Sequence, residues 1–406
     1  MNSTSSLSKL LQEIDLGIFL TQNKHLSAEK FLLQGKDNTK ELNWLLAEQL
    51  NLHLKAQRKL PQFAQNHCWF TSKSYEQASG EATALFKSEL VQGKRLLDLS
   101  GGLGVDDWAF SSFFKEIISL DPDNFLNELV RFNYTKLDIE TIKRLDSTAE
   151  DFLLRQDIGH FDLIYLDADR RSAQTKSFSL DHDSPNFLLL HARCMELSDT
   201  VMLKLSPMLD LAYLRQNLAG LQKLIILGDK NEVKEIIALI GKTPNKTIEI
   251  EAVLLQENQD TMRFSNMQNK ATNVNNYIGL NTPEDFKKYL FEPHPCIIKA
   301  GLSKAYSQYF GLNQIAISSY LYTGAILPQN FMGRAFEIVQ VFAYSKSKLS
   351  LYIKEQKLVQ ANITKRNFKQ TVQEIRKTFK LADGGSDYLF FTTDANGIRL
   401  VFHAIK

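Results

Sequence analysis

Three glycines and three aspartates lie together in residues 96–110, LLDLSGGLGVDDWAF, where an apolar run meets an amphipathic segment. The apolar run predicts a strand that ends at Asp98. Glycine has no Cβ and tolerates positive φ, so the backbone after this strand can pass close to a ligand. The glycines concerned are Gly101, Gly102 and Gly104. A nucleotide-like ligand is the first expectation, although Gly-rich turns alone are weak evidence.

Two more aspartates follow at the ends of the next apolar runs. Asp121 stands about 20 positions after Gly101, the spacing at which a dinucleotide-binding fold places an acid for the ribose hydroxyls. Asp146 closes the run IKRLD, where we expect its carboxylate to accept from an adenine amino group. A solvated loop aspartate explains Asp146 equally well.

The pattern permits two ligands, NAD and S-adenosylmethionine, and the charge of the turn distinguishes between them. In NAD-binding turns a helix start faces the pyrophosphate, whereas this chain has Asp106 and Asp107 there, and carboxylates would repel a diphosphate. S-adenosylmethionine has no phosphate, and Asp98 could attract its ammonium end. The acidic turn therefore favours S-adenosylmethionine. The competing interpretation is a tight turn whose aspartates only cap a helix.

The 406 residues are 44% hydrophobic and 23% charged, which is enough apolar material for several packed domains. Apolar residues recur at helical spacing over residues 1–74, which predicts an N-terminal helical domain. From residue 94, short apolar runs alternate with amphipathic segments, which predicts an α/β domain with a mostly parallel sheet, residues 75–256. The expected strands are 95–99, 116–120, 161–167, 200–205, 224–228 and 248–255.

Two smaller C-terminal modules are expected, one over residues 331–406 from the pattern below and one over residues 277–328 that only the family resemblance given below implies. Residues 256–277 are polar and Asn-rich, typical of a linker or a long hairpin. After residue 331 the runs FEIVQVFAYS, LSLYIK, NFKQTVQEIRKTFKL, YLFFTTD and IRLVFHAI predict an α+β domain with strands around one helix. Asn396 and Gly397 predict a tight hairpin turn.

The cysteines Cys68, Cys194 and Cys296 are far apart, with no CxxC pair and no histidine at ligand spacing. This pattern favours neither disulfides nor a metal site, and a cytoplasmic location is expected. The N-terminus lacks a basic region followed by an apolar core, and no run approaches about 18 uninterrupted apolar residues, so neither export nor a membrane span is expected.

Several motifs together resemble the class I S-adenosylmethionine-dependent methyltransferases. The resemblance extends more narrowly to a bacterial group with a C-terminal THUMP-like domain, whose proposed activity is RNA methylation. It implies a Rossmann-like, seven-stranded domain, then a ferredoxin-like module and the THUMP-like end, and no established substrate. One departure is Ala168, where the family usually has proline. The motifs are YEQASGEATALFK, LLDLSGGLGVD, YLDADRR, KLSPMLD, NEVKEII, YLFEPHPCIIKAGL and MGRAFEI.

Asp167, in YLDADRR, is the leading catalytic candidate, because it ends a strand at the edge where a doubly wound sheet binds ligands. Its carboxylate could orient a target amine or receive its proton, or simply accept backbone hydrogen bonds. Arg170 is expected to bind phosphate or form a local ion pair. Lys204 ends a later strand, where substrate contact and a buried salt bridge are equally good interpretations.

The segment EQASGEAT precedes the first strand and could close over the cofactor. Gln77 and Ser79 are the candidate contacts, with Thr83 also possible. Without the family resemblance, they would be ordinary residues at the start of a helix. Cys194 lies in LLLHARCMEL, where a packed core thiol is favoured over a nucleophile.

The C-terminal end is basic: residues 344–380 contain ten Lys/Arg and two Glu, a local charge of +8. In the helix predicted there, Lys365, Lys369, Arg376 and Lys380 would fall within about 60° of arc at 100° per residue. Phe368, Val372, Ile375 and Phe379 form a separate apolar stripe that would dock on the sheet. The basic face would then bind RNA phosphates, although such faces are often only solvated.

The sequence therefore favours a methyltransferase that binds S-adenosylmethionine and acts on RNA, either rRNA or tRNA. Two alternatives stay open. One is methylation of a protein or small molecule, with the basic domain as an assembly surface. The other is an RNA-binding protein that has lost activity, which the departure at Ala168 makes conceivable.

Overall fold

The computed structural model describes Leu11 and residues 13–34, 39–167, 169–170 (backbone only), 180, 183–243, 246–257, 259–268, 286–316 and 319–406. The chain forms two compact units. Unit 1 comprises residues 1–223 and 236–248, and unit 2 comprises residues 224–235 and 249–406. Among the described residues, no helix has the length and apolar character needed to cross a membrane.

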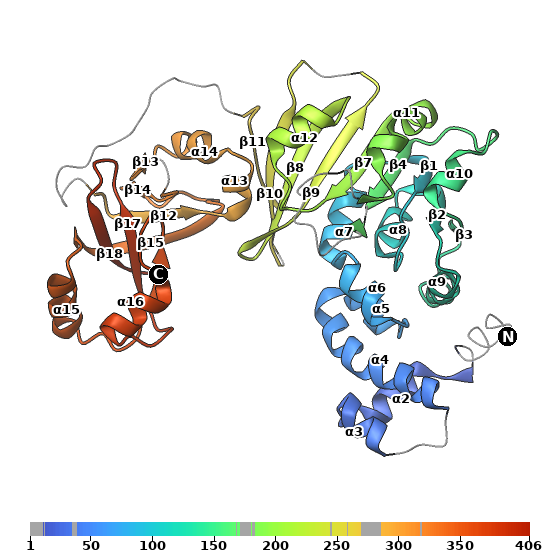
Figure 1. Ribbon diagram of the computed structural model, residues 1–406, viewed down its shortest axis with the longest axis horizontal. Coiled ribbons are helices and arrows are strands. Elements are labelled where there is room, and N and C mark those ends of the chain that lie inside the picture. The colour runs from blue at the N-terminus through green and yellow to red at the C-terminus, as the bar shows by residue number, and fades with distance from the viewer. Residues whose placement is uncertain are drawn as a thin grey trace. The chain divides into compact units, whose positions relative to one another are not determined.

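A largely parallel sheet forms the centre of unit 1, with the order β9–β7–β4–β1–β2–β3 (Figure 1). Buried residues dominate β4, β7 and the C-terminal ends of β1 and β2, and these segments read as apolar runs in the sequence, whereas β3 at the edge has one buried residue. The expected parallel sheet is thus confirmed. Strand β9 runs antiparallel beside β7. The strands are β1 (Gly93–Asp98), β2 (Phe114–Asp121), β3 (Ile142–Asp146), β4 (Leu163–Asp167), β7 (Thr200–Leu205) and β9 (Glu232–Gly241).

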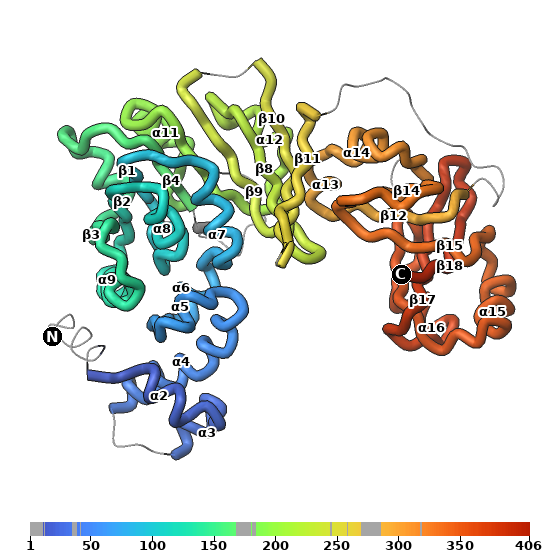
Figure 2. Tube along the Cα trace, turned by 180° about the vertical axis from the view of Figure 1, so that it is seen from behind, coloured from blue at the N-terminus to red at the C-terminus, as the bar shows by residue number. Residues whose placement is uncertain are grey.

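Helices with side-chain caps follow β2, β3 and β7. Asp123 accepts from the backbone N–H of Leu126 and starts α9 (Asn124–Lys136), which packs on β2 and β3 and lies beside β3 in Figures 1 and 2. Side-chain caps also start α10 (Ala149–Leu153), α11 (Phe187–Leu197) and α12 (Leu211–Asn217). The turn residues between strand and helix are thereby collected at the carboxyl edge of the sheet.

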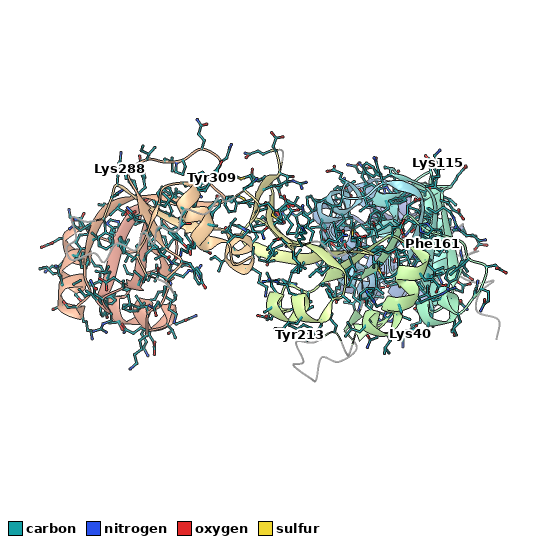
Figure 3. All side chains as sticks on the ribbon, turned by 90° about the horizontal axis from the view of Figure 1, so that it is seen from above. Lys40, Lys115, Phe161, Tyr213, Lys288 and Tyr309 are labelled. Atoms are coloured by element: carbon teal, nitrogen blue, oxygen red, sulfur yellow. The ribbon has the colours of Figure 1, made fainter. Side chains whose placement is uncertain are left out.

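Polar contacts at the opposite edge fix β1 against β4. The Asp162 carboxylate accepts from the backbone N–H groups of Lys94, at 2.6 Å, and Arg95, at 2.8 Å. The Arg95 guanidinium lies 4.5 Å from the ring centre of Phe161, which is fully buried and labelled in Figure 3. Because Asp98 pairs with Tyr165 in this register, Asp98 and Asp167 lie at the same edge of the sheet.

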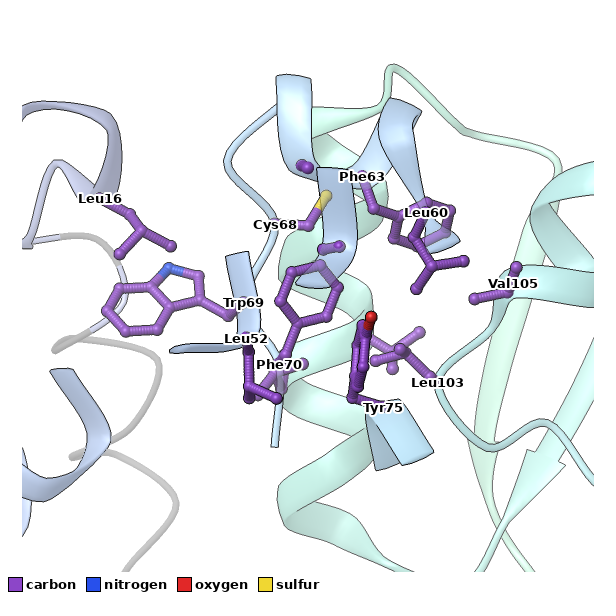
Figure 4. Packing of buried hydrophobic residues seen from close by; sticks show 14 of the residues in the cluster. Leu16, Leu52, Leu60, Phe63, Cys68, Trp69, Phe70, Tyr75, Leu103 and Val105 are labelled. Carbon is purple, nitrogen blue, oxygen red and sulfur yellow. The ribbon is translucent and has the colours of Figure 1, made fainter. Parts of the chain in front are cut away.

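Helices dominate the N-terminal part of unit 1, as expected, and one hydrophobic core joins them to the α/β part. Figure 4 shows Trp69, Phe70 and Tyr75 packed in the core that also holds Leu103 and Val105. The helices are α2 (Leu16–Asn23), α3 (Ala28–Leu33), α4 (Lys40–Lys59), α5 (Pro61–Gln65), α6 (Ser72–Gln77) and α7 (Glu81–Ser88). This shared core fixes α6 and α7 beside the glycine turn.

Unit 2 contains strands in the order β11–β10–β8 and a second sheet in the order β13–β14–β12–β15–β18–β17–β16. Strands β10 (Glu249–Leu255) and β11 (Met262–Ser265) pair antiparallel, so the polar segment after residue 256 begins as a hairpin. The other elements are β8 (Leu221–Asp229, with residues 224–229 in unit 2), β12 (Tyr289–Pro293), β13 (Asn313–Gln314), β14 (Tyr322–Gly324), β15 (Gly333–Ala343), β16 (Asn362–Lys365), β17 (Asp387–Thr393), β18 (Arg399–Ile405), α13 (Pro295–Lys299) and α14 (Ser303–Tyr309).

Two expectations for the C-terminal end are wrong. The run LSLYIK is not a strand but belongs to helix α15 (Lys346–Glu355), which Ser345 caps and Leu349 anchors in the core. Helix α16 is also shorter than predicted, Val372–Phe379, because Thr371 and Glu374 form a capping box at its start. The expected turn at Asn396 and Gly397 between β17 and β18 is confirmed, with Gly397 at φ 81°.

Candidate functional site

A cavity of about 710 Å³ opens at the carboxyl edge of the unit 1 sheet. Its walls are the glycine turn after β1, the residues that end and follow β2, and six residues in and around α6, which are Thr71, Lys73, Ser74, Gln77, Ala78 and Ser79. Asp167 at the end of β4 and residues 148–150 complete the lining, together with Ser184 and Pro185. The cavity therefore lies where an open α/β sheet binds its ligands.

Asp121 is attached to the glycine turn. Its Oδ2 accepts from the N–H of Gly102 at 3.1 Å, and its Oδ1 accepts from the N–H of Asp123 at 2.9 Å. A carboxylate has about four lone-pair sites, so acceptor positions are left for a ligand. Gly102 and Gly104 have φ of 49° and 77°, which explains the need for glycine at these two positions.

Beneath the turn, Asp107 is fully buried and does not face the cavity. Its Oδ2 lies 3.3 Å from the Arg144 guanidinium and accepts from the hydroxyls of Ser119, at 2.5 Å, and Tyr134, at 3.1 Å. Burial raises the pKa of Asp107, while Arg144 and the hydrogen bonds oppose this rise. A Cβ on Gly101 would lie 2.3 Å from Ser119 Oγ, so Gly101 lets the turn sit directly on this network.

Asp106 is paired with a second buried cation. Lys87 Nζ lies 3.0 Å from its Oδ1, while the hydroxyls of Ser79 and Tyr165 each donate to its Oδ2 at 2.8 Å. Burial favours the neutral carboxyl, but the charges of Lys87 and Lys204 and the hydrogen bonds from Lys87 and Ser79 outweigh that effect and lower the pKa of Asp106. Asp107 is thus paired with Arg144, and Asp106, which lines the cavity, is paired with Lys87. These cations weaken the repulsion of a diphosphate that is expected from the two aspartates, and whether NAD is excluded stays a prediction.

Asp98 lines the cavity, but only 1% of its surface is exposed. One carboxyl oxygen accepts from the N–H of Ser100 at 2.7 Å and from its hydroxyl at 3.0 Å. Burial, and then the charge of Asp107, raise the pKa of Asp98 well above its usual value. Its attraction for an ammonium group therefore depends on the loss of a proton.

Asp146 is not brought into the cavity. It lies opposite Asp121 in the register of β2 and β3, but its carboxylate accepts from Asn127 at 2.7 Å and Arg131 at 2.9 Å. The residues after it, Thr148, Ala149 and Glu150, line the cavity instead. Sequence reasoning missed them, although Thr148 is recognisable as a helix cap two residues beyond the strand.

Gln77 and Ser79 both line the cavity. Gln77 is exposed, whereas Ser79 is buried, where Lys87 donates to its hydroxyl at 2.8 Å. Thr83 instead donates to the carbonyl of Gly80 within its own helix. Thr71, Lys73 and Ser74 are further lining residues that the sequence did not single out.

Asp167 and Lys204 form a close ion pair, with Nζ 2.5 Å from Oδ2, where β4 and β7 end. The backbone N–H of Asp167 donates to Ser100 Oγ at 2.6 Å, which ties the strand end to the glycine turn. Burial raises the pKa of Asp167, and the charge of Lys204 opposes that rise. Asp167 lines the cavity, whereas Lys204 is not among the lining residues. Ala168 and the Arg170 side chain lie outside the described residues.

Cys194 is buried, and burial raises the pKa of its thiol to about 12, so it is a core thiol as expected. His191 Nε2 lies 3.1 Å from the carbonyl oxygen of Ala219. Within the described part of the chain, no three His, Cys, Asp or Glu residues are grouped so as to hold a metal ion.

The four basic candidates do not share one helix face. Lys365 ends β16 and donates to the carbonyl of Phe368, and Lys369 precedes α16. Arg376 lies in α16, where it donates to the carbonyls of Ala361 and Ala382 and pairs with Asp383. Lys380 follows the helix as its left-handed cap. Of the predicted apolar stripe, Phe368, Ile375 and Phe379 are buried in one cluster, whereas Val372 is half-buried and outside that cluster, and Phe368 precedes the helix.

Comparisons with known proteins agree with this architecture. Residues 289–331 match a family model described as a ferredoxin-like domain, and residues 333–404 match one described as THUMP domain-like. The chain is also similar to the crystal structure of a "putative methyltransferase from Porphyromonas gingivalis W83", with 27% identity and a TM-score of 0.83, over 99% of this chain and 97% of that one. The chain has the fold of a class I methyltransferase with ferredoxin-like and THUMP-like domains. The resemblance noted in the sequence is thus confirmed.

Looser similarities cover parts of the chain. A "putative class i s-adenosylmethionine-dependent methyltransferase" from Listeria monocytogenes is 12% identical over 64% of this chain and 94% of that one, with a TM-score of 0.37. A "putative methyltransferase from streptococcus mutans in complex with SAH" is 10% identical over 40% of this chain and 96% of that one, with a TM-score of 0.30. No curated protein matches the sequence.

Proposed function

We propose that the chain is an S-adenosylmethionine-dependent methyltransferase that acts on RNA. The observation that carries the proposal is the cavity at the carboxyl edge of the sheet, where the Asp121 carboxylate is bound to the N–H of Gly102. The full-length similarity to the Porphyromonas gingivalis protein supports methyl transfer. The THUMP domain-like match over residues 333–404 supports RNA as the substrate.

The cavity suits S-adenosylmethionine in size and chemistry. Its volume of about 710 Å³ is within the usual range for small-ligand sites. A Cβ on Gly102 would meet nothing closer than the Ser100 carbonyl oxygen at 3.7 Å, so the backbone is open to a ligand there. When bound, S-adenosylmethionine supplies a methyl group on a positively charged sulfonium. Asp121 would hold the ribose hydroxyls, and Asp98 the ammonium end.

Asp167 is proposed to act on the substrate. Its carboxylate lies at the cavity and could accept a hydrogen bond, and then a proton, from a target amine. Lys204 holds this carboxylate at 2.5 Å and favours its charged form, which makes Lys204 a positioning residue. Methyl transfer is a displacement at carbon, so alignment of the nucleophile contributes most of the acceleration, up to about 7–11 kcal/mol in favourable cases.

Titration calorimetry with S-adenosylhomocysteine tests the cofactor assignment. We expect Asp121→Ala to weaken binding by roughly 10-fold or more, because the proposed hydrogen bonds from the ribose hydroxyls to this charged carboxylate are lost. Asp146→Ala is the matched control, because Asp146 lies opposite Asp121 in the sheet but outside the cavity lining. Absence of binding by the unaltered protein, equal loss in both variants, or competition by NAD would overturn the assignment.

Transfer of labelled methyl groups tests the substrate. Total RNA from a strain that lacks this protein should become labelled, and mapping would identify the nucleotide. Label in protein or small molecules but not in RNA would select the first alternative. RNA binding without cofactor binding would select an inactive RNA-binding protein.

A further inference from the structure

A second cavity, of about 750 Å³, lies within unit 2 and has no part in the proposed methyl-transfer site. It is formed by strand β11 with the turns on either side of it, by helix α14 and its C-cap, and by Gln329, Asn330 and Met332. We call it the Tyr309 pocket after the aromatic residue at its side. Most of its lining comes from the β10–β11 hairpin and the ferredoxin-like domain.

Tyr309 presents an aromatic ring that its neighbours hold in place. The residue is 63% exposed, although it is large and mostly apolar. Its ring meets the ring of Phe264 at a centroid distance of 5.6 Å and that of Phe310 at 5.0 Å, both edge-to-face. Phe264 is in turn buried and packs edge-on against Tyr306 at 4.9 Å. The Tyr309 side chain, labelled in Figure 3, is therefore both accessible and fixed.

Side-chain amides form much of the polar wall of the pocket. Each amide offers both a hydrogen-bond donor and an acceptor in one plane. Gln268 is oriented through its Oε1, which accepts from the N–H of Ser265 at 3.3 Å. Asn330 is held in the left-handed region at φ 58°, which asparagine tolerates better than most residues. The amide residues are Gln256, Gln259, Gln268, Gln329 and Asn330.

The charges of the pocket are balanced. Asp260 and Arg263 both line it, and the Arg263 guanidinium lies 3.7 Å from the carboxylate of Glu251. A phosphate site would need an excess of cations, as in Arg and Lys clusters. The pocket therefore suits a flat, uncharged ligand with donors and acceptors on its edge.

We propose that the Tyr309 pocket binds one unpaired base of RNA. The base would stack on the Tyr309 ring, and the amides would contact its edge, which is the way proteins recognise single-stranded RNA. This proposal rests on RNA being the substrate. It adds that unit 2 selects unpaired nucleotides, which the THUMP domain-like match does not state.

Fluorescence anisotropy with the full chain tests the pocket. The probe is a labelled single-stranded RNA of about 12 nucleotides, compared with its duplex. Tyr309→Ala should weaken binding of the single strand by roughly 5- to 100-fold, and of the duplex much less, because stacking needs an unpaired base. Tyr309→Phe keeps the stacking face and should bind like the unaltered protein. Trp44→Ala, which removes a 59% exposed ring on α4, is the matched control.

A cross-link gives an independent measurement, because it reports where on the chain the RNA lies. The same RNA with 5-iodouridine should attach under ultraviolet light to a peptide that contains Tyr309. The amides contribute separately: Gln329→Ala should change which base is preferred more than it changes the affinity for mixed-sequence RNA.

The outcomes separate this pocket from the proposed function. If the unaltered protein binds single-stranded RNA but Tyr309→Ala binds it equally well, or the cross-link lies elsewhere, the pocket proposal is overturned and the function stands. Equal losses for Tyr309→Ala and Tyr309→Phe would overturn stacking. If the unaltered protein binds no RNA but binds a peptide or protein through Tyr309, both the RNA substrate and the base pocket are wrong.

Discussion

The Asp107 carboxylate lies 3.3 Å from the Arg144 guanidinium, and neither side chain has any exposed surface. Arg144 also donates to the carbonyl of Gly102 and to the side chains of Asn127, at 2.5 Å, and Ser119, at 3.1 Å. One buried cation thus ties the glycine turn to the second strand and to helix α9. The geometry of the cavity depends on this ion pair.

Loss of Arg144 should therefore destabilise the fold strongly. Arg144→Met leaves the Asp107 charge buried without its cation, which typically costs about 3–5 kcal/mol of unfolding free energy. Urea unfolding of the full chain measures this loss of unfolding free energy. Arg131→Met is the control, because Arg131 pairs with Asp146 at 2.9 Å but both side chains are 42% exposed, and such pairs contribute about 0–1 kcal/mol. Equal losses in the two variants would contradict the structural role of Arg144.

Gly101 should be sensitive to a single added methyl group. Its Cβ would lie 2.3 Å from Ser119 Oγ and 2.4 Å from Arg144 Nη1, so Gly101→Ala must displace the buried network, at a typical cost of about 1–3 kcal/mol. At Gly102 the cost comes from φ 49° instead, since the nearest atom is 3.7 Å away.

A double-mutant cycle separates these two causes. In the Arg144→Met background the cost of Gly101→Ala should change, because the two residues share the network, whereas Gly102→Ala should add independently. Unfolding free energies of the single and double variants provide the measurement. If the free-energy cost of Gly101→Ala is the same in both backgrounds, the added methyl group does not displace the Arg144 network.

The sequence predicted the backbone of the site better than its side-chain partners. Strand ends such as Asp98, Asp121 and Asp167 were predictable, because buried parallel strands read as apolar runs and end at one edge. Partners such as Lys87 for Asp106 were not, since only the packing of α7 on α8 (Val105–Phe110) brings them together.

Local ambiguity explains the errors at the C-terminal end. The run LSLYIK has the alternation of a strand, but its apolar residues are also compatible with one face of a short helix. In the structure it is helical, and Leu349 packs in the core. The long basic helix was predicted from an uninterrupted run, whereas the capping box at Thr371 starts the helix after Lys369. The hydroxyl and carboxylate three residues apart, Thr371 and Glu374, were the signal for that start.

Cofactor binding should release a proton from Asp98. Its pKa is raised by burial and by Asp107, so the carboxyl favours the neutral form, whereas a bound ammonium group favours the carboxylate. The affinity for S-adenosylhomocysteine should then increase as pH rises towards the raised pKa. Calorimetry in buffers with different ionisation enthalpies measures the released proton. Asp98→Asn should abolish the release, and a release that persists in this variant would place the titrating group elsewhere.

Methyl transfer should lose rate in acid through Asp167. Burial raises the pKa of this carboxyl, and Lys204 opposes the rise, so the reactive carboxylate is lost as pH falls through the raised pKa. Lys204→Met removes the opposing charge and should shift the acid limb of kcat/KM to higher pH. Lys204→Arg keeps the charge and should leave the limb near its original position. A uniform loss of rate with an unchanged limb would assign Lys204 a purely structural role.

The salt dependence of RNA binding should distinguish Lys369 from Arg376. Lys369 is exposed before α16, so Lys369→Glu should weaken RNA binding and reduce the slope of log K against log salt by about 1 or more. Arg376 instead donates to the carbonyls of Ala361, at 3.1 Å, and Ala382, at 2.8 Å, so Arg376→Glu should mainly lower the stability of unit 2. Filter binding over a salt series and urea unfolding measure the two effects. An unchanged slope for Lys369→Glu would remove this residue from the RNA interface.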